Sequence, residues 1–126
     1  MAAAFVDHVM DLLGAWGGVT AGRMFGGHGI YRRGVIFGLV IQDVLYLKTD
    51  EVNRPEFEAS GQGPFTYQGK GKVVTTSYWE VPSHCLDDAE ELQRWSEAAW
   101  AVSQRKTAVK RKKAAPKKQK PVARKP

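Results

Sequence analysis

The stretch RMFGGHGIYRRGVIFGLVIQDVLYLK, residues 23–48, decides the fold of this chain. It contains three runs that favour extended structure, at 23–32, 35–41 and 44–48, and links of two residues separate them. Links this short join antiparallel strands in hairpins. The run 35–41 is apolar at both odd and even positions, which is typical of a central strand covered on both faces. The stretch therefore predicts an antiparallel meander of three strands.

The rest of the chain predicts three amphipathic helices and a second hairpin. Apolar residues recur at helical spacing, and the acidic pair Asp87-Asp88 suits the positive end of a helix dipole. We expect helices at 3–15, at about 51–60 and from 87 onward, and strands at 65–68 and 72–81. This order, helix, three strands, helix, two strands, helix, predicts an α+β fold with two layers. Its antiparallel sheet has about five strands, with the helices mainly on one side.

Charge divides the 126 residues into two unequal parts. Residues 1–103 hold eight Lys and Arg against thirteen Asp and Glu, a net charge of −5, whereas residues 104–126 hold eleven Lys and Arg and no acid. The second part also contains three prolines and no aromatic residue, so it cannot bury enough apolar surface to fold. We predict one acidic domain at 1–103, followed by a disordered basic tail at 104–126.

Several classes of protein are excluded by composition. The single cysteine, Cys85, argues against a disulfide scaffold and fits a reducing cytoplasm. The first residues lack the basic start of a signal peptide, and the longest apolar run, 34–41, is far shorter than the ~20 residues of a membrane-spanning helix. His8, His28 and His84 have no paired ligand spacing. We therefore expect a cytoplasmic protein without a membrane partner, metal or cofactor.

Two segments resemble catalytic or cofactor motifs but lack the required context. The cluster Gly26-Gly27-His28-Gly29 is followed by a strand rather than by the helix that a phosphate-binding loop needs, so we expect a bulge or tight bend where another backbone approaches. The pair His84-Cys85 lies on one loop with no third group to orient the imidazole. The sequence thus indicates a protein that is not an enzyme.

The basic tail is the main candidate for binding nucleic acid. Clustered cations neutralise phosphates and release counterions without reading bases. A solubilising tail, a nuclear-localisation signal and attraction to an anionic membrane remain as alternatives. Arg23, Arg32 and Arg33 form a second cationic group and are secondary candidates for phosphate contacts. The proposed tail contacts are Arg105, Lys106, Lys110, Arg111, Lys112, Lys113, Lys117, Lys118, Lys120, Arg124 and Lys125.

Aromatic residues on the predicted strands provide candidate contact surfaces. Some of them must point away from the helices, where they could stack on unpaired bases or pack in a dimer. Packing in the core or in a dimer is favoured because the surrounding sheet is not basic. Tyr78, Trp79 and Trp100, the last flanking the apolar stripe of the third helix, are the candidates for contact with a partner or a second copy.

Residues 23–31, RMFGGHGIY, resemble the glycine-rich signature of the amino-terminal domain of the TfoX/Sxy family. The segments 45–48 with Asp50, 64–67 and 77–82 also resemble the family, in the same order, and residues 53–58 resemble its second helix. The resemblance covers about residues 3–102. It implies a two-layer fold related to secretion-chaperone-like domains. It also implies a relation to regulators of natural competence, described as acting with the cyclic-AMP receptor protein at promoters of DNA-uptake genes.

The resemblance and the residues together predict a regulatory protein that is not an enzyme. Full-length competence regulators carry a second, helical domain, and a lysine-rich tail stands in its place here. We expect a transcriptional co-regulator that acts through a protein partner, such as a transcription factor or RNA polymerase, while its tail binds DNA without sequence preference. A homodimer is also considered. The alternative is an accessory module that binds RNA through exposed sheet aromatics.

Overall fold

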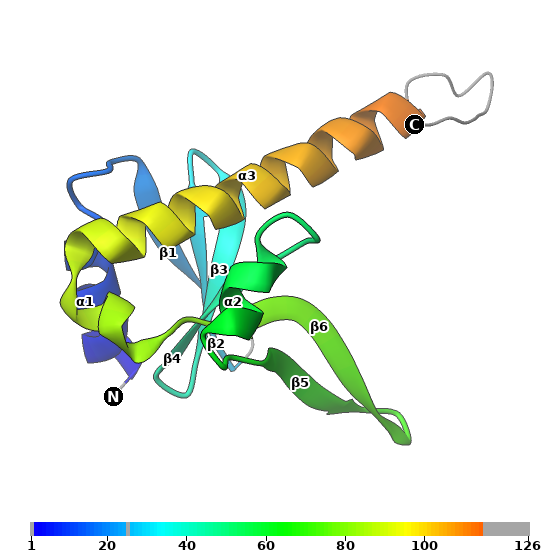
Figure 1. The fold of residues 1–126 in the computed structure, drawn as a ribbon, viewed down its shortest axis with the longest axis horizontal. Coiled ribbons are helices and arrows are strands. Elements are labelled where there is room, and N and C mark those ends of the chain that lie inside the picture. The colour runs from blue at the N-terminus through cyan, green and yellow to red at the C-terminus, as the bar shows by residue number, and fades with distance from the viewer. Residues whose placement is uncertain (1, 25, 115–126) are drawn as a thin grey trace.

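The computed structural model describes residues 2–24 and 26–114, with side chains for residues 4–24 and 26–105. A six-stranded sheet, three α-helices and one short 3-10 helix make up this part of the chain (Figure 1). The elements in chain order are α1 (Ala2–Leu12), β1 (Val19–Met24), β2 (Gly27–Arg32), β3 (Val35–Ile41), β4 (Val44–Lys48), α2 (Arg54–Ala59), β5 (Pro64–Gly69), β6 (Lys72–Glu80), η1 (Ser83–Asp87) and α3 (Ala89–Ala114).

The sheet has the order β1-β2-β3-β4-β6-β5, and every neighbouring pair is antiparallel. The predicted α+β class and the antiparallel sheet are confirmed. The sheet has six strands instead of about five, because the predicted strand 23–32 is two strands. Met24 and Gly27 are paired residues of β1 and β2, so the chain reverses within the glycine cluster, and β1 begins earlier than predicted, at Val19.

Two glycines of this cluster allow very close packing. A Cβ atom on Gly27 would overlap the carbonyl oxygen of Val40 in β3. A Cβ atom on Gly29 would lie 3.0 Å from the Tyr31 ring and 3.1 Å from Cδ1 of Ile36. The prediction of a tight bend where another backbone approaches is therefore confirmed.

The helices pack on one face of the sheet. A single buried cluster joins Val9 of α1, Phe57 of α2 and Leu92 of α3 to Leu45 and Leu47 of β4. In β4 the buried residues alternate with half-buried ones, as expected when one face of a strand meets the helical layer. Figure 1 shows α3 running across the sheet as the longest helix of this layer.

The other face of β3 is not covered as predicted. The register shifts next to the pair Tyr31–Ile36, and this bulge places Phe37 in the helical core against Trp16, at 5.6 Å between ring centroids. Half-buried side chains remain on the opposite face, and no helix of residues 2–24 and 26–114 lies over them. We call this surface the open face; its main side chains are those of Tyr31, Ile36, Leu39, Ile41, Tyr46, Phe65 and Tyr78.

The third helix is longer than the sequence indicated. Asp88 Oδ1 accepts hydrogen bonds from the backbone N–H groups of Glu90 and Glu91, at 3.1 and 3.2 Å, and so fixes its start. The helix continues to Ala114, whereas disorder was expected from residue 104. Residues 104–114 are mostly Ala, Lys, Arg and Gln, which have high helix propensity, and the first proline of the tail is Pro116. The expected disorder of 115–126 lies outside the described residues.

Candidate nucleic-acid interface

The basic segment begins where α3 leaves the core. Val102 and Ser103 are buried, and the Ser103 hydroxyl donates a hydrogen bond of 2.6 Å to the carbonyl oxygen of Ile36. Gln104 and Arg105 are exposed. Beyond them the helix extends away from the sheet (Figure 1). The end of α3 is therefore held by the domain only up to Arg105 among the side chains that the structure describes.

Arg105 is the one predicted tail contact with a described side chain, and it is paired with the domain. Its guanidinium donates hydrogen bonds of 2.8–3.0 Å to both carboxylate oxygens of Asp50. Asp50 also accepts from the backbone N–H of Val52 at 2.9 Å. Burial tends to raise the pKa of Asp50, but these hydrogen bonds and the charge of Arg105 hold that pKa below its ordinary value. Arg105 thus anchors the helix to the domain.

The next five cationic positions lie on the helical part of the tail. Lys106, Lys110, Arg111, Lys112 and Lys113 all fall within α3. At ~100° per residue these positions are distributed around the helix axis and form no single stripe. The remaining predicted tail contacts, Lys117, Lys118, Lys120, Arg124 and Lys125, lie outside the described residues. The helix therefore spaces these five cationic positions along and around its axis.

The three arginines of the predicted secondary group lie in different environments. Arg32 is half-buried between two indole rings, with its guanidinium carbon 4.3 Å from the centroid of Trp16 and 4.8 Å from that of Trp100. Its Nε donates to the carbonyl oxygen of Gly17 at 2.9 Å. Arg23 and Arg33 are exposed. Arg32 therefore acts as a structural clamp, and only the other two are open to a phosphate.

The three aromatic candidates also lie in different environments. Trp100 is half-buried, and its Nε1 donates a hydrogen bond of 3.0 Å to the carbonyl oxygen of Arg32. Trp79 packs edge-on against Phe57, at 6.4 Å between centroids, on the helical side. Tyr78 alone of the three lies on the open face, where Lys48 Nζ is 4.6 Å from its ring centroid. Burial, with a contribution from Tyr31, raises the pKa of the Tyr78 hydroxyl.

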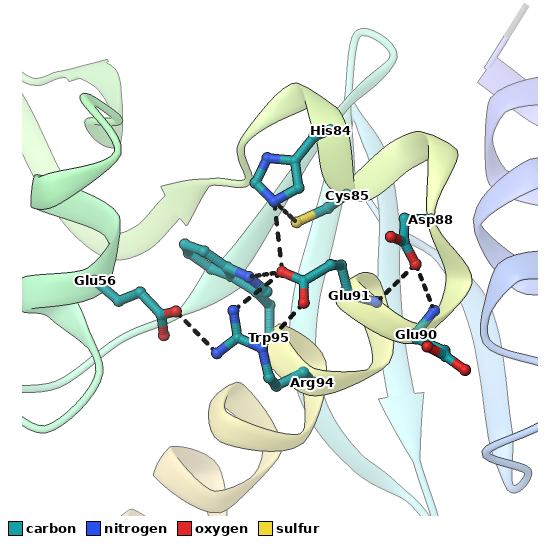
Figure 2. Close-up of polar contacts among 8 residues, drawn as sticks. All are labelled: Glu56, His84, Cys85, Asp88, Glu90, Glu91, Arg94 and Trp95. Atoms are coloured by element: carbon teal, nitrogen blue, oxygen red, sulfur yellow. Dashed lines mark hydrogen bonds and ion pairs between the residues drawn. The ribbon is translucent and has the colours of Figure 1, made fainter.

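His84 and Cys85 belong to a cluster that joins η1 to α3 (Figure 2). His84 Nε2 lies 3.9 Å from Cys85 Sγ and 3.5 Å from a Glu91 carboxylate oxygen. In a catalytic triad the acid binds one imidazole nitrogen and the nucleophile uses the other, but here both contacts are made by the same nitrogen. Cys85 is fully buried, and burial raises its pKa to about 11, so the sulfur stays a thiol at neutral pH.

The acidic and basic residues of this cluster form a bracket between elements. Arg94 bonds to Glu91 at 3.0 Å and to Glu56 of α2 at 2.8 Å, and Trp95 Nε1 donates to Glu91 at 3.3 Å. The Arg94 hydrogen bond is the main reason that the pKa of Glu91 falls to about 2. Figure 2 shows Arg94 directed toward both carboxylates. The arrangement fastens α2 and η1 to the start of α3.

Two wider features of the described residues bear on the class of protein. Within residues 2–24 and 26–114, no cluster of three or more His, Cys, Asp or Glu side chains is arranged to hold a metal ion. No helix in this part of the chain has the length and apolar character needed to cross a membrane.

Comparison with known families gives a clear assignment. The model of the TfoX N-terminal domain matches residues 11–103. The chain belongs to this family. A search of the curated proteins gave no significant match. The family match ends at Ser103, where the last buried side chain of α3 is anchored, so the basic segment lies outside the matched residues.

The family match confirms the resemblance seen in residues 23–31, and the structure shows contacts that the sequence did not reveal. Arg32 and Trp100 were both candidate contacts, but no spacing indicated that they form one sandwich with Trp16. Likewise, no local signal paired Asp50 with Arg105. The TfoX N-terminal domain is a competence-related family, and that relation is the coarse functional assignment for this chain.

Proposed function

We propose that this protein is a regulatory, non-enzymatic member of its competence-related family whose basic C-terminal segment binds nucleic acid without sequence preference. One observation carries the proposal. Eleven cations and no acid follow residue 103; Arg105 is held by Asp50, and α3 carries the next five positions away from the sheet (Figure 1). A segment with this charge is attracted to phosphates, because each neutralised phosphate releases condensed counterions.

The charge of the domain supports this division of labour. Residues 1–103 have a net charge of −5, so phosphates are repelled by the domain as a whole. Eleven of the thirteen acidic residues lie in α1, η1, α3, α2 or the few residues directly preceding α2 and α3. Inside the six strands, four basic residues accompany a single acid, Glu80. The negative charge is thus concentrated in the helical layer.

Specificity in this proposal comes from a protein partner. Phosphate contacts position a protein on DNA but carry no sequence information, and the cationic positions of α3 form no single stripe along the helix. We expect the protein to act in the cytoplasm, where a transcription factor or RNA polymerase bound to the acidic domain would select the promoter. The segment would increase the local affinity for DNA.

A salt series on the intact chain tests the proposal. If about five cations engage duplex phosphates, log K falls with log salt at a slope of about −4.5, at ~0.9 per phosphate. Changing Lys110, Arg111, Lys112 and Lys113 to Gln should reduce the magnitude of that slope by up to about 3.6. Binding is measured by fluorescence anisotropy with a labelled duplex of arbitrary sequence.

A matched variant controls for net charge. Lys70 and Lys72 are exposed cations of the domain outside the predicted phosphate-binding group, and changing these two to Gln removes the same total charge as changing Lys112 and Lys113 alone. The proposal expects this control to keep most of the wild-type slope. Equal losses in the two double variants, or a wild-type slope near zero, would show that the basic segment is not the binding element.

A further inference from the structure

The open face is an apolar surface that the described chain does not cover. Ile36, Leu39 and Ile41 of β3 are half-buried there, beside Tyr46 of β4. Phe65 of β5 extends the surface, at 4.9 Å between the centroids of its ring and that of Tyr46. Solvent-exposed faces of antiparallel strands are normally polar. A face with this composition is typical of a contact surface.

The rest of this chain is a poor candidate for covering the surface. Apart from Phe25, the undescribed remainder consists of Met1 and residues 115–126, APKKQKPVARKP. The latter segment holds five cations and few apolar side chains, and it follows a helix that extends away from the sheet (Figure 1). An apolar strand surface is not complementary to such a segment.

We propose that the open face binds the open face of a second copy of this chain, around a two-fold axis that runs along the strands between β3 and β4. Leu39 and Tyr46 are directly paired residues of these two strands. In the order β1-β2-β3-β4-β6-β5, the boundary between β3 and β4 is the centre of the sheet. The axis therefore brings Leu39 of each copy opposite Tyr46 of the other.

This symmetry matches the chemistry of the two halves of the face. Aliphatic side chains come from β3, whereas the aromatic side chains come from β4, β5 and β6, with Tyr31 of β2 as the one exception among the main side chains of the face. Rotation about the proposed axis places the aliphatic half of one copy on the aromatic half of the other. A two-fold interface requires this kind of self-complementarity, in which residue i contacts j and j contacts i.

Charge and area also favour a second copy. The acids lie mainly in the helical layer, so the two domains can meet at the sheet with little repulsion despite their equal net charge. Glu80, which is paired with Tyr46, is the one acid of the six strands, and the same face also carries the cation Lys48 beside Tyr78. Six strands at ~4.8 Å and strands ~20 Å long give a flat area of about 580 Å² per copy. An interface of this size lies at the low end of protein interfaces, below ~1,200 Å² in total, and fits a weak, reversible dimer. Two stacked sheets then form a sandwich with the helices outside.

Sedimentation of the intact chain over a dilution series tests the proposal directly. We expect a reversible dimer that persists in high salt, because its contacts are apolar. Leu39→Glu should weaken dimerisation by about 100-fold or more, since the change places a charge at the centre of the interface on both copies. Val52→Glu is the control, because Val52 is 68% exposed and lies outside the sheet.

Mixing two monomeric variants tests the axis. Leu39→Glu and Tyr46→Lys should each dissociate alone, whereas an equimolar mixture should recover a heterodimer, because the carboxylate introduced in one chain would meet the ammonium group introduced in the other. Circular dichroism and thermal unfolding test whether both variants are folded. If either variant is unfolded, the wild-type dilution series, compared with the Val52→Glu control and repeated in high salt, decides the question.

Several outcomes would overturn the proposal. These are a wild-type chain that stays monomeric at tens of micromolar, a dimer that high salt dissolves, loss of the dimer in Val52→Glu, or no recovery on mixing folded variants. A monomer that binds single-stranded RNA, and loses this binding on Tyr78→Ala, would assign the open face to nucleic acid. Failure of the dimer leaves the salt dependence of DNA binding intact, so the two proposals can fail separately.

Discussion

Residues 89–103 and residues 104–114 of α3 share a helical backbone but differ in composition and in packing. Residues 89–103 bury Leu92, Trp95 and Val102 and lie within the family match, whereas residues 104–114 contain six cations and no acid. The first part is helical because its apolar stripe packs on the sheet. The second part is helical because its residues favour helix and no proline interrupts them. One continuous helix therefore runs past the end of the family match.

Truncating the core of the first part should produce the largest effect. Trp95 is 3% exposed and packs edge-on against Phe57, at 4.8 Å between centroids. Trp95→Ala should lower the free energy of unfolding by about 3–5 kcal/mol, the cost of a large cavity. Urea unfolding followed by circular dichroism measures the change. A loss below about 1 kcal/mol would mean that the first part of α3 does not hold the core together.

The same measurement on the four-Gln variant of residues 110–113 sharpens the contrast. These positions lie beyond the last side-chain contact described for α3, so their replacement should change the stability by no more than about 0.5 kcal/mol. A stability loss similar to that of Trp95→Ala would instead make the basic segment part of the domain.

The predictability of the fold differs between local and non-local features. The meander, the second hairpin and the starts of the helices follow from spacing and turn residues in the sequence. The extra strand was missed because β1, VTAGRM, has no strong apolar alternation and is extended by its pairing with β2. The open face was missed because a bulge moves Phe37 to the helical side, and the apolar run itself contains no sign of that shift.

Replacing each of two adjacent arginines by alanine should give the next largest difference in stability. Arg32 is held between Trp16 and Trp100 and hydrogen-bonded to a carbonyl oxygen, whereas Arg33 is exposed. Arg32→Ala should cost about 1–3 kcal/mol of stability, through lost packing and an unsatisfied carbonyl group. Arg33→Ala should cost about 0.5 kcal/mol or less.

The arginine pair is decided by thermal unfolding and by the fluorescence of the two indoles. Equal stability losses in Arg32→Ala and Arg33→Ala would contradict the clamp. Loss of DNA affinity in Arg32→Ala without any loss of stability would return Arg32 to the phosphate-binding group predicted from the sequence.

The candidate interface was only partly predictable, because the sequence shows where charged residues are but not which of them are bound to other side chains in the fold. Counting residues located the basic segment and the acidic domain. Counting did not show that Arg105 is bound to Asp50 or that Arg32 is enclosed by tryptophans, because the partners are 55 and 16 or 68 residues apart in sequence. Charged residues bind where the fold leaves them free, and that depends on the tertiary structure.

Removing the ion pair between Asp50 and Arg105, which anchors α3 to the domain, should have a smaller effect on stability. Arg105 is 43% exposed, so its ion pair is screened, and Asp50→Asn should cost about 0.5–1 kcal/mol at neutral pH. The pKa of Asp50 is lowered in the folded state, so its contribution is present above the unfolded pKa and is lost as pH falls through the folded pKa. Wild type and Asp50→Asn should therefore converge in acid. A stability difference that persists or grows below the folded pKa would exclude the ion pair as its source.

Breaking the helix inside the basic segment should have the smallest effect on stability. Ala108→Pro removes a backbone hydrogen bond and clashes with the preceding turn, which costs about 3 kcal/mol locally. That cost falls only on residues beyond the domain, so global unfolding should change by no more than about 0.5 kcal/mol while circular dichroism loses helix. Counterion release depends on charge more than on backbone conformation, so the salt slope of DNA binding should stay within about one unit of wild type. If the slope collapses with the helix, the helix itself is what the phosphates recognise, and the second part of α3 needs its conformation as much as the first part does.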